Sequence, residues 1–492
     1  MGIAVESFIL DPSHRGTLQR QLQEMVTGAI LSGRFRPGDK LPSSRGLAKH
    51  LGISRITVTL AYTELVANDY LTSHGRSGYF VSDSAPRPPS FPKGTPHAQD
   101  SSVDWTRAIS QRLVPGPSLH RPADWRRYRY PFIYGQTDAK LFDHQNWRKC
   151  ALQALGARDF EVLTTDSYGR DDPDLVDQII RQILPRRGIF ARPEEVLITM
   201  GAQNALWIAT QILLNQRRMA VMEHPCYPSL REILDLSRCK TLAVPVDGGG
   251  LPPEHVPPET DVLFITPSHH CPSSVTMPIA RRRALLARAE ADDFLIVEDD
   301  YEFELAFAGS PSPALKSLDS GGRVVYIGSF AKSLFPGLRL GYIVAPEPLV
   351  AEARTLRSLI LRHVPGHIQR AAAYFLAQGH YDAQVHKMAR AYRERRNVAE
   401  QAIADQGLHI EGASSFGGSS IWMRAPDGVA ATALARHLQN RQVLIEPGTP
   451  FFGIQSGGES FYRLAYSSIS ASQIPEGIRR IAETGRALAE HP

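Results

Sequence analysis

Residues 326–342 read YIGSFAKSLFPGLRLGY and place a lysine among apolar neighbours directly after a strand-like run. The run ends at Gly328, and Ser329, Lys332 and Arg339 follow. Apolar surroundings lower the pKa of an ammonium group, so a neutral amine becomes available to attack an aldehyde. A hydroxyl and a guanidinium both suit phosphate. The stretch indicates an amine that reacts with a phosphate-bearing aldehyde, although a surface lysine in a loop also fits it.

A second stretch, upstream, supplies an acid. Residues 294–298 (FLIVE) form a short apolar run that ends in Asp299, Asp300 and Tyr301. A carboxylate at the carboxyl end of a parallel strand can face a cofactor. Pyridoxal 5'-phosphate (PLP) needs such an acid at its pyridine nitrogen. Paired aspartates alone more often cap a helix or lie in a turn, but together with Lys332 after the next strand they favour a PLP site.

These residues resemble fold-type I PLP enzymes, the aspartate aminotransferase class, over roughly residues 130–492. The motif S-x-x-K is present as Ser329 to Lys332. The resemblance implies that Lys332 forms the Schiff base and that Ser329 and Arg339 bind the phosphate. It also implies that Asp299 holds the pyridine nitrogen and that Tyr301 contacts the ring oxygen O3'.

Further cofactor and substrate residues are expected on other segments. Gly201-Ala202-Gln203 follows a strand-like run and opens a helix, where the backbone N–H groups of Ala202 and Gln203 can bind the PLP phosphate. The resemblance implies that Tyr227 stacks on the ring and that Tyr168 reaches the phosphate of the partner subunit in a homodimer. It implies that Arg463 binds a carboxylate, with a surface ion pair as the alternative.

Three positions depart from the family pattern. Cys271 stands where aminotransferases carry an asparagine, and a thiol is a poor donor to O3'. His269 or His270 is a candidate replacement for that amide. Two smaller departures are Ser274 and Asp172, at positions where glycine is common in similar proteins.

The body reads as an α/β fold with a largely parallel sheet. Apolar runs at 196–199, 219–222, 262–265, 295–297 and 324–327 alternate with helical stretches such as 202–214 and 279–291. Continuous apolar strands separated by helices are typical of a sheet covered on both faces. Ligands bind at the carboxyl ends of the strands in such folds.

Residues 1–82 read as a winged helix-turn-helix (α+β). An amphipathic helix at 17–32 precedes a short helix at 45–51, a Gly52-Ile53 turn and a third helix capped by Ser54. Val58, Ala61, Tyr62 and Leu65 form the inward stripe of that third helix. Ser54, Arg55 and Thr57 then face outward at its start, where such helices reach base edges. Two short strands at 70–73 and 77–81 form a basic wing, with a three-helix bundle as the alternative.

The segments 41–48 (LPSSRGLA) and 51–58 (LGISRITV) resemble GntR-family DNA-binding domains. The resemblance implies contacts of Arg45, Arg55 and Thr57 with double-stranded operator DNA. It places the wing tip at His74, Gly75 and Arg76.

Composition and charge are compatible with this division. Residues 83–129 form a proline-rich and basic linker, and the basic excess of the chain (net charge +5) lies in the N-terminal part, which favours an anionic partner. The basic run 126–129 is expected to be a solvated face. Four cysteines without metal-ligand spacing predict no metal site and a reduced, cytoplasmic location at the nucleoid. No signal segment or bilayer-spanning run is expected.

A GntR-like head, a linker and an aminotransferase-like body (130–492) together resemble the MocR subfamily of bacterial regulators. The resemblance implies a PLP-dependent transcriptional regulator that senses a small amino compound by aldimine exchange at Lys332, with at most weak transaminase activity. Two alternatives stay open: an aminotransferase that carries a DNA-binding head, and a regulator that senses PLP itself. Candidate effectors are gamma-aminobutyrate, taurine, an ectoine-derived diamino acid and PLP.

Overall fold

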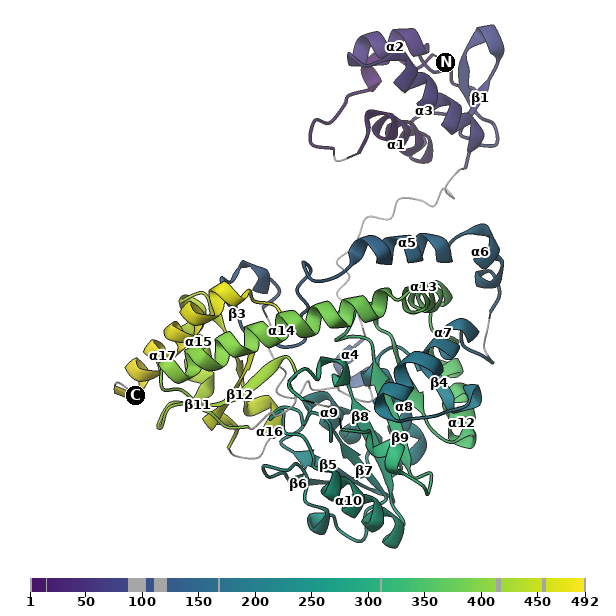
Figure 1. Ribbon diagram of the computed structural model, residues 1–492. Helices are drawn as coiled ribbons and strands as arrows, with labels where there is room; N and C mark the ends of the chain where they lie inside the picture. Colours follow the sequence, from purple (N-terminus) through teal and green to yellow (C-terminus); the bar gives the residue numbers. More distant parts are fainter. Residues whose placement is uncertain are drawn as a thin grey trace. The chain divides into compact units, whose positions relative to one another are not determined.

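The computed structural model describes residues 2–14, 16–86, 103–109, 122–166, 169–309, 312–412, 417–453 and 457–490. The chain divides into two compact units, Met1–Arg112 and Leu113–Pro492 (Figure 1). This division falls within the predicted linker, most of which lies outside the described residues. The predicted boundaries at residues 82 and 129 stay predictions.

The first unit is here called the head, and its described residues up to 86 contain three α-helices and a hairpin. The helices are α1 (Leu18–Leu31), α2 (Ser44–Leu51) and α3 (Arg55–Ala67), and β1 (Leu71–Ser73) pairs antiparallel with β2 (Tyr79–Val81). Thr17, Ser43 and Ser54 cap the helices by accepting a backbone N–H of the first turn. The second strand begins later than predicted, because residues 75–77 form a short 3-10 turn and Gly78 has a φ of 98°.

The head has its own apolar core, to which each helix contributes one face. The predicted stripe of α3 is buried, and the Tyr62 hydroxyl donates to the Pro42 carbonyl at 3.1 Å. Ala85 is buried in the same core, three residues beyond the predicted end of the head. The hairpin packs against the same helices, so the elements form a winged helix-turn-helix and not a bare helical bundle.

The second unit, here called the body, is built on a seven-stranded sheet with the order β4-β10-β9-β8-β7-β5-β6. All neighbouring strands are parallel except β10, which runs antiparallel to both β4 and β9. The strands are β4 (Val196–Thr199), β5 (Met219–His224), β6 (Lys240–Pro245), β7 (Val262–Ile265), β8 (Leu295–Asp300), β9 (Val324–Ser329) and β10 (Gly341–Val344). The five apolar runs found in the sequence are all strands of this sheet.

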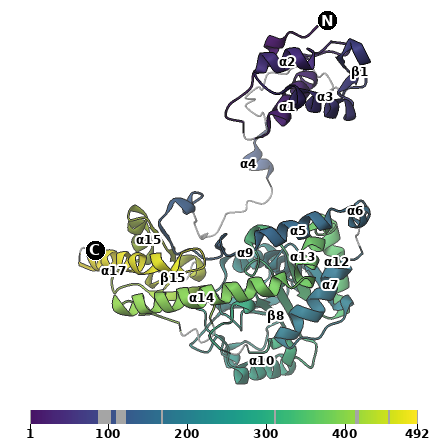
Figure 2. The same ribbon diagram turned by 45° about the horizontal axis from the view of Figure 1, so that its top comes forward.

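Helices cover both faces of the sheet, as the sequence predicted. Alternate residues of each strand enter different cores: Val297 and Val325 pack with α8 (Ala202–Leu213) and α9 (Pro228–Ser237), whereas Ile296 and Val324 pack with α10 (Ile279–Ala291). Further helices are α5 (His144–Ala154), α6 (Ala157–Leu163), α7 (Pro173–Gln178), α11 (Leu315–Leu318), α12 (Glu347–Leu361) and α13 (Gly366–Ala377). Figure 2 shows these helices around the sheet.

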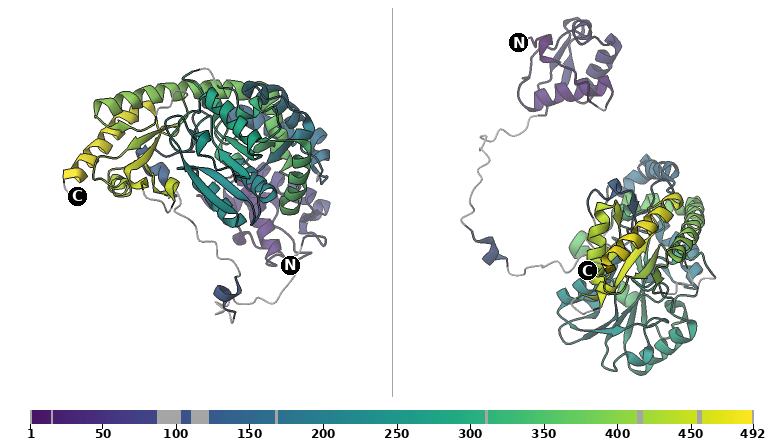
Figure 3. Two further views of the ribbon diagram at one scale, coloured as in Figure 1. Left: turned by 90° about the horizontal axis from the view of Figure 1, so that it is seen from below. Right: turned by 90° about the vertical axis from the view of Figure 1, so that its left-hand side faces the viewer.

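A smaller C-terminal subdomain adjoins the large sheet. The long helix α14 (His380–Asp405) runs from α13 toward this subdomain, where it packs on α17 (Ile474–Glu490) (Figure 3). Its four-stranded sheet has the order β11-β12-β15-β14, formed by β11 (His409–Ile410), β12 (Ser420–Arg424), β14 (Glu446–Pro447) and β15 (Phe461–Ala465). The strand β13 (Val443–Leu444) pairs in parallel with β3 (Tyr130–Pro131), which ties the start of the body to its end. The remaining helices are α4 (Trp105–Ala108), α15 (Ala431–Asn440) and α16 (Thr449–Phe452).

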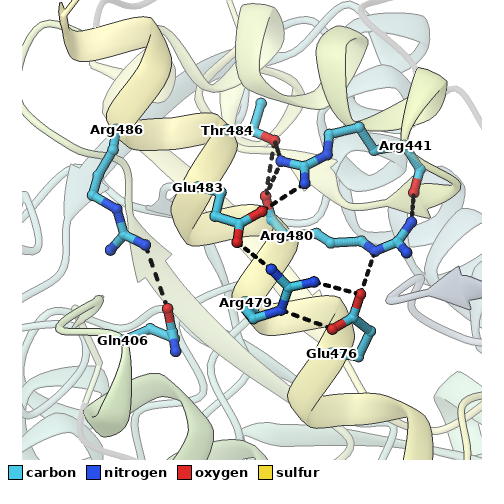
Figure 4. A network of polar contacts seen from close by, with 8 residues as sticks. All are labelled: Gln406, Arg441, Glu476, Arg479, Arg480, Glu483, Thr484 and Arg486. Carbon is cyan, nitrogen blue, oxygen red and sulfur yellow. Dashed lines mark hydrogen bonds and ion pairs between the residues drawn. The ribbon is translucent and has the colours of Figure 1, made fainter.

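Charged side chains connect α17 to the end of α15 in a network of hydrogen bonds and ion pairs. Arg441, at the end of α15, donates to Glu483 at 2.6 Å and to the Thr484 hydroxyl at 2.9 Å, and Arg480 donates to the Arg441 carbonyl at 2.9 Å (Figure 4). Because several partners share each charge, this network fixes the helix pair better than isolated surface ion pairs would.

Within the described ranges, no helix combines the length and the apolar character needed to cross a bilayer.

Candidate functional site

The predicted cofactor residues meet at the carboxyl ends of β8 and β9. These strands are parallel neighbours, and Asp299 lies opposite Ile327. Ser329 ends β9, and Lys332 follows three residues later. The sheet register therefore brings Asp299 and Lys332 to the same edge although 33 positions separate them in the sequence.

A cavity of about 430 Å³ opens at this edge, within the usual range for small-molecule sites. Nearly all of the predicted cofactor and effector residues line it. Tyr168 lies outside the described residues, so its predicted role is not assessed. The lining includes Tyr134, Gly135, Gln136, Ala202, Gln203, Tyr227, Cys271, Asp299, Tyr301, Ser329, Lys332, Arg339 and Arg463.

One end of the cavity has the donors that a phosphate requires. The helix α8 begins at Ala202 after Gly201, whose φ of 84° requires glycine. The Arg339 guanidinium lies against this turn and donates to the Met200 carbonyl at 3.2 Å, and a Cβ at Gly201 would lie 3.4 Å from it. A helix N-terminus, a guanidinium and the Ser329 hydroxyl together fit a phosphate dianion.

Asp299 presents a carboxylate oxygen to the cavity. It is buried, and its Oδ1 has no hydrogen-bond partner among the described residues. Burial, and then the charge of Asp300, raise the pKa of Asp299 to about 7. A buried acid with an unsatisfied oxygen fits a ligand that brings an N–H or a positive charge, as a protonated pyridine does.

Lys332 lies under an aromatic ring that sequence reasoning missed. Its Nζ is 3.8 Å from the centroid of the Tyr134 ring. Gly135, which follows Tyr134, has a φ of 75°, and a Cβ there would lie 2.8 Å from Lys332 Nζ. Any side chain at position 135 would therefore displace the amine, and glycine keeps the approach to Lys332 open.

Arg463 is buried and paired with Glu446. Its Nε donates to Glu446 Oε2 at 2.9 Å, and its Cζ lies 3.9 Å from the Tyr134 centroid and 4.7 Å from that of Phe451. Burial would lower the pKa of Arg463, but Glu446 outweighs it and the pKa is raised. The ion pair is thus internal, and the alternative of a surface pair is wrong. Glu446 engages the guanidinium through Nε, and Arg463 lines the cavity, where a guanidinium suits an acid group.

Cys271, predicted to stand in place of the asparagine, lines the cavity, and burial raises the pKa of its thiol to about 11. Neither of the two candidate histidines is among the residues that line the cavity. His269 Nε2 pairs with Glu302 at 3.1 Å, and the His270 ring contacts the Ser273 hydroxyl at 2.6 Å and the Pro225 carbonyl at 3.0 Å. The replacement of the amide by a histidine stays a prediction that these contacts do not favour. Tyr301 lines the cavity, but its hydroxyl donates to the His269 carbonyl at 2.8 Å.

The two glycine departures have local explanations. Ser274 has a φ of 63°, a left-handed conformation that favours glycine. Asp172 caps α7 by accepting the N–H groups of Asp174 and Leu175, and its carboxylate pairs with Arg370 at 2.8 Å. The first departure strains the backbone, whereas the second adds a helix cap.

The head exposes the residues predicted to contact DNA. Arg45 near the start of α2 and Arg55 at the start of α3 are exposed, and Arg55 Nε donates to the Ser44 hydroxyl at 3.4 Å. The predicted wing tip of His74, Gly75 and Arg76 is exposed. Thr57 was expected to face outward, but it is half-buried and precedes the buried Val58 of α3.

Missed site residues came from segments without a motif. Tyr134 follows the short strand β3, and Glu446 lies on the two-residue strand β14. Tyr134 contacts Lys332 and Arg463, which lie more than a hundred residues further along the chain, whereas Glu446 enters the site through its ion pair with Arg463 on the neighbouring strand β15. A signal of this kind is visible in the folded chain alone.

Comparison with known proteins agrees with both units. Residues 18–81 match the family of bacterial regulatory proteins, gntR family, and residues 140–481 match aminotransferase class I and II. The chain is 57% identical to the HTH-type transcriptional regulator TauR of Rhodobacter capsulatus, over 99% of this chain and 100% of that protein. It is 30% identical to the probable rhizopine catabolism regulatory protein MocR of Rhizobium meliloti, over 98% and 96%.

Among solved structures, the α-aminoadipate aminotransferase LysN of Thermus thermophilus, complexed with N-(5'-phosphopyridoxyl)-L-leucine, has a TM-score of 0.69. It is 27% identical and covers 79% of this chain and 100% of its own. The kynurenine aminotransferase of Pyrococcus horikoshii, at 24% identity and a TM-score of 0.68, shares the fold over 75% of this chain and 95% of its own. The chain therefore belongs to the MocR-type transcriptional regulators of the gntR family, which join a helix-turn-helix head to an aminotransferase class I and II body.

Proposed function

We propose that this regulator binds PLP in the body, binds operator DNA through the head and responds to a small amino compound that carries an acid group. The cofactor part of the proposal rests on the Asp299 oxygen that lacks a hydrogen-bond partner. It lies in one cavity with Lys332 and with the donors that suit a phosphate. PLP supplies an aldehyde that reacts reversibly with primary amines. The phosphopyridoxyl ligand of LysN, which shares this fold, supports the same cofactor.

The charged and hydroxyl groups that face the cofactor and the effector then have distinct tasks. Lys332 presents its amine to the aldehyde, and Asp299 holds a proton at the pyridine nitrogen. Arg339, Ser329 and the start of α8 bind the phosphate. The Arg463 fork binds the acid group of the effector.

The spacing of the two cations limits the size of the effector. Both Lys332 Nζ and Arg463 Cζ lie within 4 Å of one ring centroid, so they are at most about 8 Å apart. A molecule that bridges them has an amine and an acid separated by only a few bonds. Cys271, a weak donor in place of an amide, disfavours the alternative of an efficient aminotransferase.

We further propose a homodimer formed through the body. Apolar side chains are exposed on the segments that flank the predicted partner-facing loop: Phe160 and Val162 of α6, and Leu359 (80% exposed) and Ile360 of α12. Arg362 at the end of α12 pairs with Asp166 at 3.1 Å, which joins these two segments. A Leu359→Asp variant that stays dimeric by sedimentation velocity would contradict this interface.

The central experiment measures DNA binding and cofactor state in the same protein. Fluorescence anisotropy with the duplex upstream of the coding sequence should show sequence-preferring binding by the wild type and much weaker binding by Arg55→Ala. Titration with short acid-bearing amines should change both the visible absorbance of bound PLP and the anisotropy. The absence of sequence preference in the intact, PLP-loaded protein would overturn the proposal.

Two controls separate the alternatives. Turnover of about 1 per second or more with 2-oxoglutarate and an amine panel would favour an aminotransferase. If PLP alone, without any amine, moves DNA affinity by the full range, the protein senses the cofactor itself.

A further inference from the structure

The outward face of α3 is apolar at the point where the helix is expected to meet DNA. Ile56 is 69% exposed and Leu60 is 50% exposed. They are four residues apart and therefore lie on one face, opposite the buried stripe of Val58, Ala61 and Leu65. Two large aliphatic side chains that share an exposed helical face mark a contact surface.

The threonines on the same face have little hydrogen-bond donor capacity to offer. The Thr59 hydroxyl donates to the Arg55 carbonyl at 3.0 Å, and the Thr63 hydroxyl donates to the Thr59 carbonyl at 2.9 Å. Their hydroxyl protons are thus used within the helix. A partner of this face meets apolar groups more than hydrogen-bond donors.

The surroundings of this face indicate that the partner is DNA. Arg55 precedes Ile56, Arg45 is exposed on the preceding helix, and the capping hydroxyl of Ser54 orients the first turn. In a helix-turn-helix, the first residues of the second helix reach base edges in the major groove. Ile56 is the second residue of α3, and Leu60 lies one turn deeper.

We propose that Ile56, assisted by Leu60, reads thymine through the C5-methyl group in the major groove. This methyl is the apolar feature that distinguishes an A·T pair there. The proposal rests on the operator binding proposed above and adds a specificity-determining contact to it. Arg55 supplies polar and electrostatic contacts, whereas Ile56 supplies apolar contact.

The test removes the methyl group without changing any hydrogen-bonding edge. Full-length protein is titrated by anisotropy with its upstream duplex and with the same duplex made with deoxyuridine in place of thymidine. Wild type should bind the deoxyuridine duplex at least about fourfold more weakly, since each contacted methyl contributes about that factor.

Two variants assign the effect to the residue. Ile56→Ala should bind the thymidine duplex more weakly than wild type and should bind both duplexes equally. Its salt dependence should match wild type, because no phosphate contact is lost. Arg55→Ala is the matched control: it should weaken binding to both duplexes and reduce the salt slope. Since Ile56 is exposed, its replacement should leave the thermal midpoint of the head unchanged.

Three outcomes would overturn the inference. Wild type binds the two duplexes equally; Ile56→Ala keeps the wild-type preference for thymidine; or Ile56→Ala changes the oligomeric state of the DNA-free protein, which would assign the face to a protein contact. Each leaves operator binding by the wild type intact. Failure of the proposed function would instead appear as no sequence-preferring binding to the thymidine duplex.

Discussion

Lys332 directs its amine nitrogen at the ring of Tyr134, 3.8 Å from the ring centroid. The same ring lies 3.9 Å from Arg463 Cζ. One aromatic side chain therefore contacts the group expected to react with the cofactor and the group expected to bind the acid of the effector. The Tyr134 ring therefore lies between Lys332 and Arg463 and contacts both.

Replacing Tyr134 by alanine should weaken the response to short acid-bearing amines about tenfold, because each cation–π contact contributes about 0.5–1 kcal/mol. Tyr134→Phe keeps the ring and should stay within about threefold of wild type. The measurement is an absorbance titration of the PLP-loaded protein with 3-aminopropanoate. Equal losses in both variants would show that the hydroxyl, and not the ring, matters.

Lys332→Ala should abolish the visible absorbance of the loaded protein and its change with amines, because no other lysine lines the cavity among the described residues. DNA binding should persist, since the core of the head is separate. Lys149→Ala, an exposed lysine on α5, is the matched control and should behave as wild type. A retained absorbance band in Lys332→Ala would show that another amine holds the cofactor.

Asp299→Asn should change how stability depends on pH. With the pKa of Asp299 at about 7 in the folded protein, this acid binds its proton more tightly folded than unfolded. The cofactor-free wild type should therefore lose stability as the pH rises from about 4 to about 7, by up to about 4 kcal/mol from this group. The asparagine variant should lose less over that range.

Thermal midpoints of the cofactor-free protein at pH 5 and pH 8 test this expectation. With PLP bound, the wild type should have the higher thermal midpoint of the two proteins, because the variant lacks the acid that holds the pyridine proton. An identical pH profile for variant and wild type would place the raised pKa elsewhere.

Arg463→Gln should lose the response to 3-aminopropanoate by about a hundredfold and keep the response to propylamine, which has no acid group. The variant leaves the Glu446 carboxylate buried without this guanidinium, which is costly. The double variant with Glu446→Gln removes both charges and controls for that cost. An equal loss toward both amines would remove Arg463 from acid recognition.

Ser274→Gly should stabilise the protein by about 0.5–1 kcal/mol, because glycine adopts a φ of 63° without strain. Ser274→Ala keeps the strain and should give no gain. The urea midpoint should rise with no change in slope. A loss of stability would show that the Ser274 hydroxyl contact with the Ser420 carbonyl, at 3.5 Å, outweighs the strain.

Local pattern was sufficient for most elements. The apolar runs, the cap at Ser54 and the inward stripe of α3 follow from propensity and periodicity, and they appear in the structure as predicted. The S-x-x-K motif and the aspartate at the end of its strand located the cavity, because strand ends in an α/β sheet meet at one edge.

Long-range contacts were beyond the reach of the pattern. Tyr134 contacts Lys332 and Arg463, which lie far along the chain, and no spacing encodes such an encounter. The contacts of His269 and His270 were beyond the pattern for the same reason. Which way each ring turns depends on Glu302 and on the Pro225 carbonyl.

The run Glu298-Asp299-Asp300 on β8 has a consequence for comparing relatives. Side chains alternate along a strand, so Glu298 accepts the N–H groups of Leu315 and Lys316 and Asp300 pairs with Arg187, while Asp299 alone faces the cavity. Loss of one residue earlier in this strand would still leave adjacent acids before a tyrosine, yet it would aim them at the wrong faces. The face to which a strand position points, counted from the register of β8 with β9, is therefore a better guide to the cofactor acid than the presence of an acidic pair.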